Sequence, residues 1–205
     1  MTEQDGSCPY ATAPFDIQWF DRVVLMLPMN DMRNRLIMFW MTLSFHAFLR
    51  IGELMALRRR DIEVNEEDGR MEISIRRSKT DQFGLGEKTY VYKTEGAGSP
   101  WTYRDVLEVM KDDDLIVGQI SDTTLRDWLK RILQNIGVKD VKNYSFHSFR
   151  RGWAHLASMR GISDSTIKAH GRWRSEAYLR YVVVDRQWAG QQVAGAMVGG
   201  RDAHQ

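Results

Sequence analysis

The stretch from Leu36 to Leu49 constrains this chain most, because it is almost wholly apolar and is bracketed by Arg35 and Arg50. Its fourteen residues are too few to cross the roughly 30 Å of hydrocarbon in a bilayer, which takes about 20 residues. A helix that is apolar all round and does not span a membrane is buried inside a protein. The sequence therefore predicts a globular fold around a central helix that continues to about Leu57.

Composition supports one folded domain in a reducing compartment. The chain has 205 residues, of which 43% are hydrophobic and 11% aromatic, too many large apolar groups for a disordered chain. A single cysteine, Cys8, excludes an internal disulfide and a multi-thiolate metal site. The N-terminus has no apolar run typical of a secretory signal, so we expect an intracellular protein. We divide it into a tether or linker remnant (1–14), a folded domain (15–185), and a C-terminal helix and tail (186–205).

Strand periodicity occurs in two short runs. Apolar and polar residues alternate over 71–76 and again over 89–92, and the turn-rich segment 78–86 joins the two runs. This pattern predicts a β-hairpin with Lys79 close to its tip. Elsewhere the periodicity is helical, so the predicted fold class is mainly α with a small antiparallel β-sheet (α+β).

Arg50 needs a partner, because a guanidinium at the end of an apolar helix is not left without hydrogen bonds. Glu53 lies three residues on, within reach on the same helical face. It could orient Arg50 while leaving other N–H donors for a phosphate. A purely structural ion pair is the alternative.

His147 and Arg150 have a spacing that places both side chains on one face of a helix start, beside the N–H groups of the first turn. Such a place suits an oxyanion. They belong to the most basic stretch, residues 143–181, which has seven Arg and Lys against two acidic residues, with Trp and Tyr interleaved. That mixture is typical of nucleic-acid contacts, and a solvated helix face with aromatic core positions is the alternative.

Arg50, Arg150, the hairpin Lys79, His147 and a tyrosine that follows them form the set that a phosphoryl-transfer site without a metal would require. Two arginines can neutralise the charge that builds on the non-bridging oxygens of a phosphate. A lysine can protonate the leaving oxygen, and a tyrosine nucleophile must lose its proton because its ordinary pKa is about 10. The chain has a candidate for each role.

Four motifs follow one another along the chain: Phe48-Leu49-Arg50-Ile51-Gly52-Glu53-Leu54, Ser78-Lys79-Thr80, His147-Ser148-Phe149-Arg150-Arg151-Gly152 and Gly171-Arg172-Trp173-Arg174-Ser175-Glu176-Ala177-Tyr178-Leu179-Arg180-Tyr181. Over about 130 residues they resemble, in the same order, the motifs of the tyrosine recombinases, the phage-integrase family. The form of the last motif is most similar to recombinases of DIRS-type and Crypton-type mobile elements.

The resemblance implies that Arg50 and Arg150 hold the scissile phosphate of a duplex DNA, with Glu53 supporting Arg50 from behind. It makes residues 15–185 a catalytic domain that works as a dimer or tetramer on DNA, in which the segment 186–205 could be exchanged between protomers. Neither a membrane nor a small-molecule substrate is implied. Basic side chains expected to contact the DNA are Arg151, Arg172 and Arg174.

The resemblance also assigns the chemistry. Tyr181 is the nucleophile that forms a 3′-phosphotyrosyl bond, and Lys79 is the general acid for the 5′ oxygen. His147 assists proton transfer, and Trp173 occupies a position held in the family by His or Trp. The covalent bond conserves the phosphodiester energy, so no metal, ATP or other cofactor is implied.

Some alternatives remain at this point. Tyr178 follows His170 by the same eight residues that separate Tyr181 from Trp173, so a second register is conceivable. Family members usually carry an upstream helical domain, which residues 1–14 cannot supply. Besides a recombinase or integrase, a type IB topoisomerase and a domesticated, non-cutting DNA-binding module fit the sequence. The location is nuclear if the chain comes from a eukaryotic element, and otherwise cytoplasmic or nucleoid.

Overall fold

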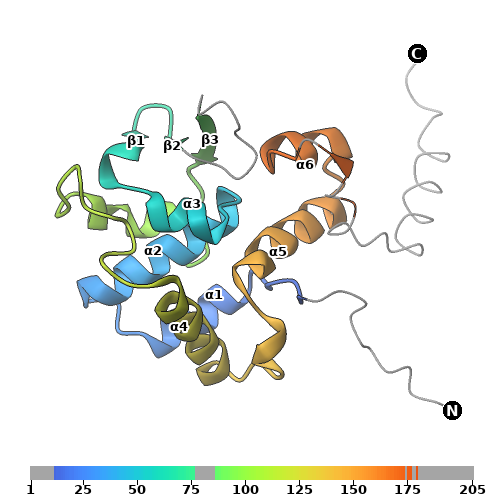
Figure 1. Ribbon diagram of the computed structural model, residues 1–205, viewed down its shortest axis with the longest axis horizontal. Coiled ribbons are helices and arrows are strands. Elements are labelled where there is room, and N and C mark those ends of the chain that lie inside the picture. Colours follow the sequence, from blue (N-terminus) through green and yellow to red (C-terminus); the bar gives the residue numbers. More distant parts are fainter. Residues whose placement is uncertain (1–11, 77–85, 174, 177–178, 180–205) are drawn as a thin grey trace, which may run out of the picture. The chain divides into compact units, whose positions relative to one another are not determined.

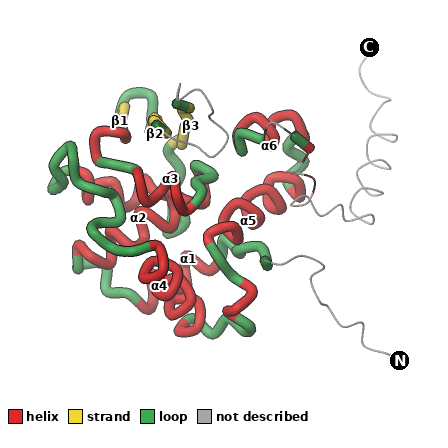
Figure 2. Tube along the Cα trace, viewed as in Figure 1, coloured by secondary structure: helices red, strands yellow, loops and turns green. Residues whose placement is uncertain are grey.

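The computed structural model describes residues 12–76, 86–173, 175–176 and 179. These residues form mainly helices with a small antiparallel sheet, which confirms the predicted fold class (Figure 2). The elements are α1 (Trp19–Met26), α2 (Met32–His46), α3 (Ile51–Ala56), η1 (Arg59–Asp61), β1 (Ile62–Asn65), β2 (Arg70–Ile75), β3 (Glu87–Tyr92), η2 (Pro100–Leu107), α4 (Asp122–Asn135), η3 (Val141–Asn143), α5 (Phe146–Met159) and α6 (Asp164–His170).

The chain divides into two compact units, residues 1–153 and 154–205, with the boundary inside α5. In the first unit α2 lies between the sheet on one side and α1 and α4 on the other (Figure 1). Every residue of α2 from Met38 to Phe45 is buried, which confirms the prediction of a central helix. The 3-10 helix η2 packs along α2.

The central helix ends earlier than predicted. One helix was expected to continue to about Leu57, but α2 ends at His46 and α3 begins anew at Ile51. Between them Phe48 has φ +53°, a left-handed conformation that stops an α-helix. The Leu49 N–H donates to the carbonyl of Ser44 at 3.2 Å, the bond that closes such a helix end. Arg50 thereby becomes the N-cap residue of α3.

The sheet has three strands in the order β1-β2-β3, all antiparallel. The predicted strand runs are confirmed as β2 and β3, paired in register from Arg70 opposite Tyr92 to Ile75 opposite Glu87. Strand β1 was not predicted; it pairs with β2 from Ile62 opposite Ile73. Lys79 and the rest of the link 77–85 lie outside the described residues.

An aromatic cluster joins the start of the chain to the core of the first unit. The Phe15 ring lies 4.9 Å from Phe20, 4.6 Å from Phe149 and 6.2 Å from Phe45, measured between centroids. The Phe15 N–H donates to the Ser148 carbonyl at 2.9 Å, so this segment lies directly on α5. A Cβ added at Gly152 would come within 2.0 Å of the Phe15 carbonyl oxygen. Glycine at 152 is therefore what allows the chain to cross the helix.

Candidate active site

Arg50 is the N-cap residue of α3 and is held there by Glu53. One carboxylate oxygen of Glu53 accepts from the Arg50 main-chain N–H at 2.9 Å and the other accepts from Nη1 at 2.6 Å. The Glu53 side chain is 3% exposed, whereas that of Arg50 is 21% exposed. The predicted Arg50–Glu53 pair is thus present, with the carboxylate inside and the guanidinium reaching solvent.

Arg150 lies on α5 and is 2% exposed. Its Nη1 donates to the main-chain carbonyl of Phe48, and its guanidinium carbon lies 5.5 Å from the centroid of the Phe48 ring. The same ring meets Trp153 edge-on at 4.4 Å. Both arginines are therefore tied to the short connection between α2 and α3, although they are far apart in the sequence.

His147 stands one turn before Arg150 at the start of α5. Its side chain reaches solvent, yet partial burial lowers its pKa, and the positive charges of Arg150, Arg50 and Arg126 lower it further. The three arginines act in the same direction as burial, so the direction does not depend on how exposed the ring is. Arg150 contacts Phe48, two residues before Arg50, and His147 lies one turn before Arg150 on α5. Arg50, His147 and Arg150 therefore belong to one electropositive neighbourhood of the first unit.

The first turn of α5 differs from the expectation of unbonded N–H groups beside His147. The His147 N–H donates to Ser145 Oγ at 3.2 Å, and the Ser148 N–H donates to the Ser145 carbonyl at 2.9 Å. Ser148 Oγ in turn accepts from the Ser145 N–H at 3.0 Å, which makes a reciprocal cap. An oxyanion here would therefore be bound by side chains and not by these two main-chain groups.

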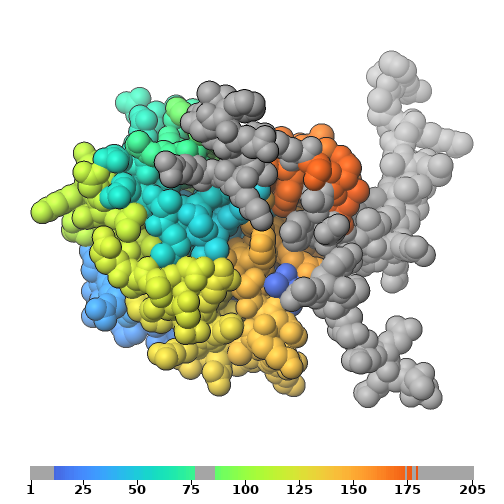
Figure 3. All heavy atoms as spheres, in the orientation of Figure 1, coloured from blue at the N-terminus to red at the C-terminus, as the bar shows by residue number. Residues whose placement is uncertain are grey.

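Arg126 was missed by the sequence analysis. It lies on α4, which packs against α3, and the two elements lie next to each other on the face shown in Figure 3. Its Nη2 donates to Asp122 at 3.1 Å, one helical turn earlier. The basic stretch counted from sequence begins at 143, so an arginine of another helix was not part of it. Only the tertiary fold brings the charge of Arg126 on α4 close enough to act on His147.

Arg151 does not have the exposure expected of a DNA contact. It is 2% exposed, and its Nη1 donates to the carbonyl of Thr12. Its guanidinium thus anchors the segment that leads to α1. A local excess of charge in the sequence does not distinguish such an arginine from one at the surface.

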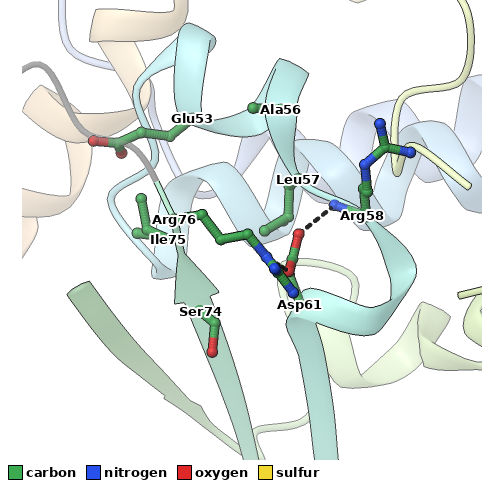
Figure 4. Close-up of a pocket in the computed structure, with 8 residues that line it drawn as sticks. All are labelled: Glu53, Ala56, Leu57, Arg58, Asp61, Ser74, Ile75 and Arg76. Carbon is green, nitrogen blue, oxygen red and sulfur yellow. Dashed lines mark hydrogen bonds and ion pairs between the residues drawn. The ribbon is translucent and has the colours of Figure 1, made fainter. Parts of the chain in front are cut away.

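A cavity of about 310 Å³ lies beside Glu53, between α3, η1 and the end of β2 (Figure 4). At its other end the buried Asp61 accepts from Arg76 Nε at 2.5 Å and from the Arg58 main-chain N–H at 3.0 Å. The Asp61 carboxylate therefore connects Arg76, which directly follows β2, to the start of η1. The residues that line the cavity are Glu53, Ala56, Leu57, Arg58, Asp61, Ser74, Ile75 and Arg76.

The second unit holds Arg172 and Trp173, just after α6. Arg172 has φ +55°, and the N–H of Trp173 donates to the Lys168 carbonyl at 3.1 Å. A Cβ at Gly171 would come within 1.9 Å of the Trp173 ring. The indole thus folds back over Gly171, which gives a local reason for the Gly-Arg-Trp sequence.

Several predicted site residues are not among those the structure describes. They are Lys79, Arg174, Tyr178 and Tyr181. Within the described ranges, no group of three or more His, Cys, Asp or Glu could hold a metal ion, and no helix is long and apolar enough to cross a membrane.

Comparison with known proteins finds a family whose model matches most of this chain. The phage integrase family model matches residues 23–185. A search of curated protein sequences found no significant match. The family model thus covers every element from α2 to α6.

Solved structures share the fold at low sequence identity. XerH site-specific recombinase bound to difH substrate, in a pre-cleavage complex, aligns with a TM-score of 0.67 and 14% identity, covering 94% of this chain and 57% of that one. XerA recombinase gives 0.67 and 16%, covering 99% and 68%. A mutant Flpe–DNA Holliday junction complex gives 0.54 and 12%, covering 86% and 49%. This chain therefore spans about half to two thirds of the length of these recombinases.

Proposed function

We propose a function from one premise: this chain belongs to the phage integrase family. It is the catalytic domain of a DNA recombinase or integrase that cuts one strand at a time and rejoins it to another. The observation that carries the proposal is the contact of Arg150 with Phe48, two residues before the Glu53-supported Arg50, with His147 one turn before Arg150 on α5.

The two arginines bind the scissile phosphate in this proposal. Negative charge grows on its non-bridging oxygens in the transition state, and two guanidiniums neutralise it through charge-assisted hydrogen bonds. Glu53 fixes the direction of Arg50 through one Nη donor. Arg150 is held through its own Nη1 by Phe48. Each arginine therefore enters the reaction already oriented.

His147 is the proton acceptor of the proposal. Because its pKa is lowered, the ring is mostly neutral near pH 7 and can take a proton from the attacking phenol. The phenol oxygen of Tyr181 forms a bond to phosphorus, and the bond from phosphorus to the 5′ oxygen breaks. Lys79 gives that oxygen its proton, so a 5′ hydroxyl leaves and a 3′-phosphotyrosyl ester remains. Trp173 lies beside this chemistry in the family pattern.

The partner follows from the reaction. We infer that the substrate is duplex DNA, held by a dimer or tetramer of this chain, with Arg172 and Arg174 as further phosphate contacts. Such an enzyme acts inside the cell, in the nucleus for a eukaryotic element and otherwise on the nucleoid. The likeness to DIRS-type and Crypton-type recombinases stays a prediction.

Covalent trapping tests the proposal. A pool of duplexes with random sequence carries a nick close to each candidate cleavage position, so that the short 5′-hydroxyl fragment diffuses away and the adduct accumulates. Denaturing gels should show protein joined to the 3′ end of DNA, with and without EDTA. Tyr181→Phe should abolish the adduct and Tyr178→Phe should retain it.

Other outcomes point elsewhere. An adduct lost in Tyr178→Phe but kept in Tyr181→Phe would move the nucleophile to Tyr178. Relaxation of any supercoiled plasmid without strand exchange would indicate a topoisomerase. DNA binding without an adduct on the whole pool would indicate a non-cutting module, and loss of cleavage in EDTA would indicate a metal nuclease.

A further inference from the structure

We propose that Phe48 is a positioning residue that sets the second arginine against the first: its left-handed main chain aims the carbonyl at Arg150, and its ring supports the same guanidinium. The inference rests on the proposed function for what the arginines do, and on the contacts of Phe48 for how they are placed.

The backbone of Phe48 is unusual for its residue type. Its φ of +53° is a conformation that glycine adopts readily and that a bulky side chain rarely does. It follows Ala47, the cap of α2, at the position where glycine commonly ends a helix. Something must therefore compensate for a phenylalanine here, since strained positions persist only where the surroundings fix them.

Arg150 supplies that compensation. A buried guanidinium needs acceptors, and the Phe48 carbonyl is one of them. The Phe48 ring is fully buried, lies 5.5 Å from the guanidinium carbon, and is braced edge-on by Trp153 at 4.4 Å. Main chain and side chain of one residue thus contact the same arginine, which a glycine could do only through its carbonyl.

The connection to Arg50 is short. Only Leu49 separates Phe48 from Arg50, whose main-chain N–H is fixed by Glu53 at 2.9 Å. A rotation at Phe48 would move the carbonyl that holds Arg150 and the start of α3 together. The carbonyl that binds Arg150 and the N-cap residue of α3 therefore lie within three consecutive residues.

The first test needs no DNA. The charge of Arg150 is the largest electrostatic cause of the lowered pKa of His147, ahead of Arg50 and Arg126, so an NMR titration of the His147 ring reports whether Arg150 stays in place. Phe48→Gly and Phe48→Ala both remove the ring, but alanine keeps the Cβ that opposes positive φ, whereas glycine removes it. His147→Asn assigns the signal in the full chain.

Arg150→Ala and Phe48→Ala should both raise the pKa of His147, and Phe48→Gly should raise it less than Phe48→Ala. Phe45→Ala is the matched control, because Phe45 is equally buried one turn earlier and its ring packs on Phe15 and Phe20 instead. It should leave the His147 pKa unchanged. Should Phe48→Ala not fold, Phe48→Leu takes its place, with a shift in the same direction. A shift in Phe48→Gly as large as in Phe48→Ala, or no shift in any Phe48 variant, would overturn the inference.

The second test asks whether Phe48 acts through Arg150 in the reaction. Phe48→Ala should slow adduct formation on the trapping substrate by about 100-fold, the cost of a small misplacement of a catalytic group. A methylphosphonate at the cleaved position lacks the charge that Arg150 neutralises, so both Arg150→Ala and Phe48→Ala should recover most of their loss on it. A loss that is equal on phosphate and methylphosphonate would mean that Phe48 is only structural. Absence of any adduct with the unaltered protein would defeat the proposed function, while the titration still decides the role of Phe48.

Discussion

Glu53 holds Arg50 at two points, through Nη1 at 2.6 Å and through the main-chain N–H at 2.9 Å. A single buried carboxylate thus fixes both where α3 begins and where the guanidinium points. The main-chain bond is a helix cap and the side-chain bond is an orienting contact, so one residue links a folding role to a proposed catalytic one.

Glu53→Gln should weaken the orienting contact more than the cap, because the amide oxygen can still accept from the N–H but no longer pairs with a charge. We expect the free energy of unfolding to fall by about 1–2 kcal/mol in urea titrations and adduct formation to slow as well. Glu66→Gln is the control: its partner Arg104 lies at 2.6 Å, but the Glu66 side chain is 57% exposed. An exposed pair contributes about 0–1 kcal/mol. Equal losses in the two variants would contradict the role given to Glu53.

Gly152→Ala should destabilise the protein, because the new methyl group would lie 2.0 Å from the Phe15 carbonyl oxygen, and backbone must shift to admit it. We expect a loss of about 1–3 kcal/mol or more in urea unfolding. Gly52→Ala, in α3, meets nothing within 4 Å and should be neutral or stabilise the helix by up to about 1 kcal/mol. A Gly152→Ala protein as stable as Gly52→Ala would show that the leading segment is not packed on α5.

The lowered pKa of His147 predicts how stability depends on pH. Just below the ordinary histidine pKa of about 6.5, His147 is protonated in the unfolded chain but is still neutral in the folded protein. The contribution of this group is therefore complete above that pH and is lost as pH falls through the lower folded value. Urea titrations across this range should show a shallower decline for His147→Asn than for the unaltered protein. An unchanged slope would be evidence against the lowered pKa.

Arg126→Gln should raise the pKa of His147, because one of the positive charges that oppose its protonation is removed. The acidic limb of the pH–rate profile for adduct formation should move to higher pH in consequence. Lys130→Gln is a suitable control, since it removes one exposed positive charge from the same helix. Identical pH–rate profiles for the two variants would mean that the charge of Arg126 does not affect the pKa of His147.

Features that depend on local periodicity were predictable. The strand runs predicted at 71–76 and 89–92 and the buried helix around Met38–Phe45 follow from alternation and from apolar runs. The structure has β2 at Arg70–Ile75, β3 at Glu87–Tyr92 and α2 at these places. Strand β1 is only four residues long and gives no periodic signal of its own. Its existence depends on an open edge of β2, which the sequence does not display.

The break between α2 and α3 and the burial of Arg151 were not predictable, for a different reason. Nothing near Phe48 in the sequence signals a left-handed residue, because the group that uses its carbonyl lies 102 positions away. Likewise, the partner of Arg151 is the carbonyl of Thr12, 139 positions away. Local composition records that a charge is present, and only the tertiary fold decides which surface it faces.

The segment from Ala13 to Phe15 is hydrogen-bonded on both sides of His147: the Ala13 N–H donates to the Asn143 carbonyl at 2.8 Å, and the Phe15 N–H donates to the Ser148 carbonyl at 2.9 Å. The segment that precedes α1 is therefore part of the support for the turn that carries His147.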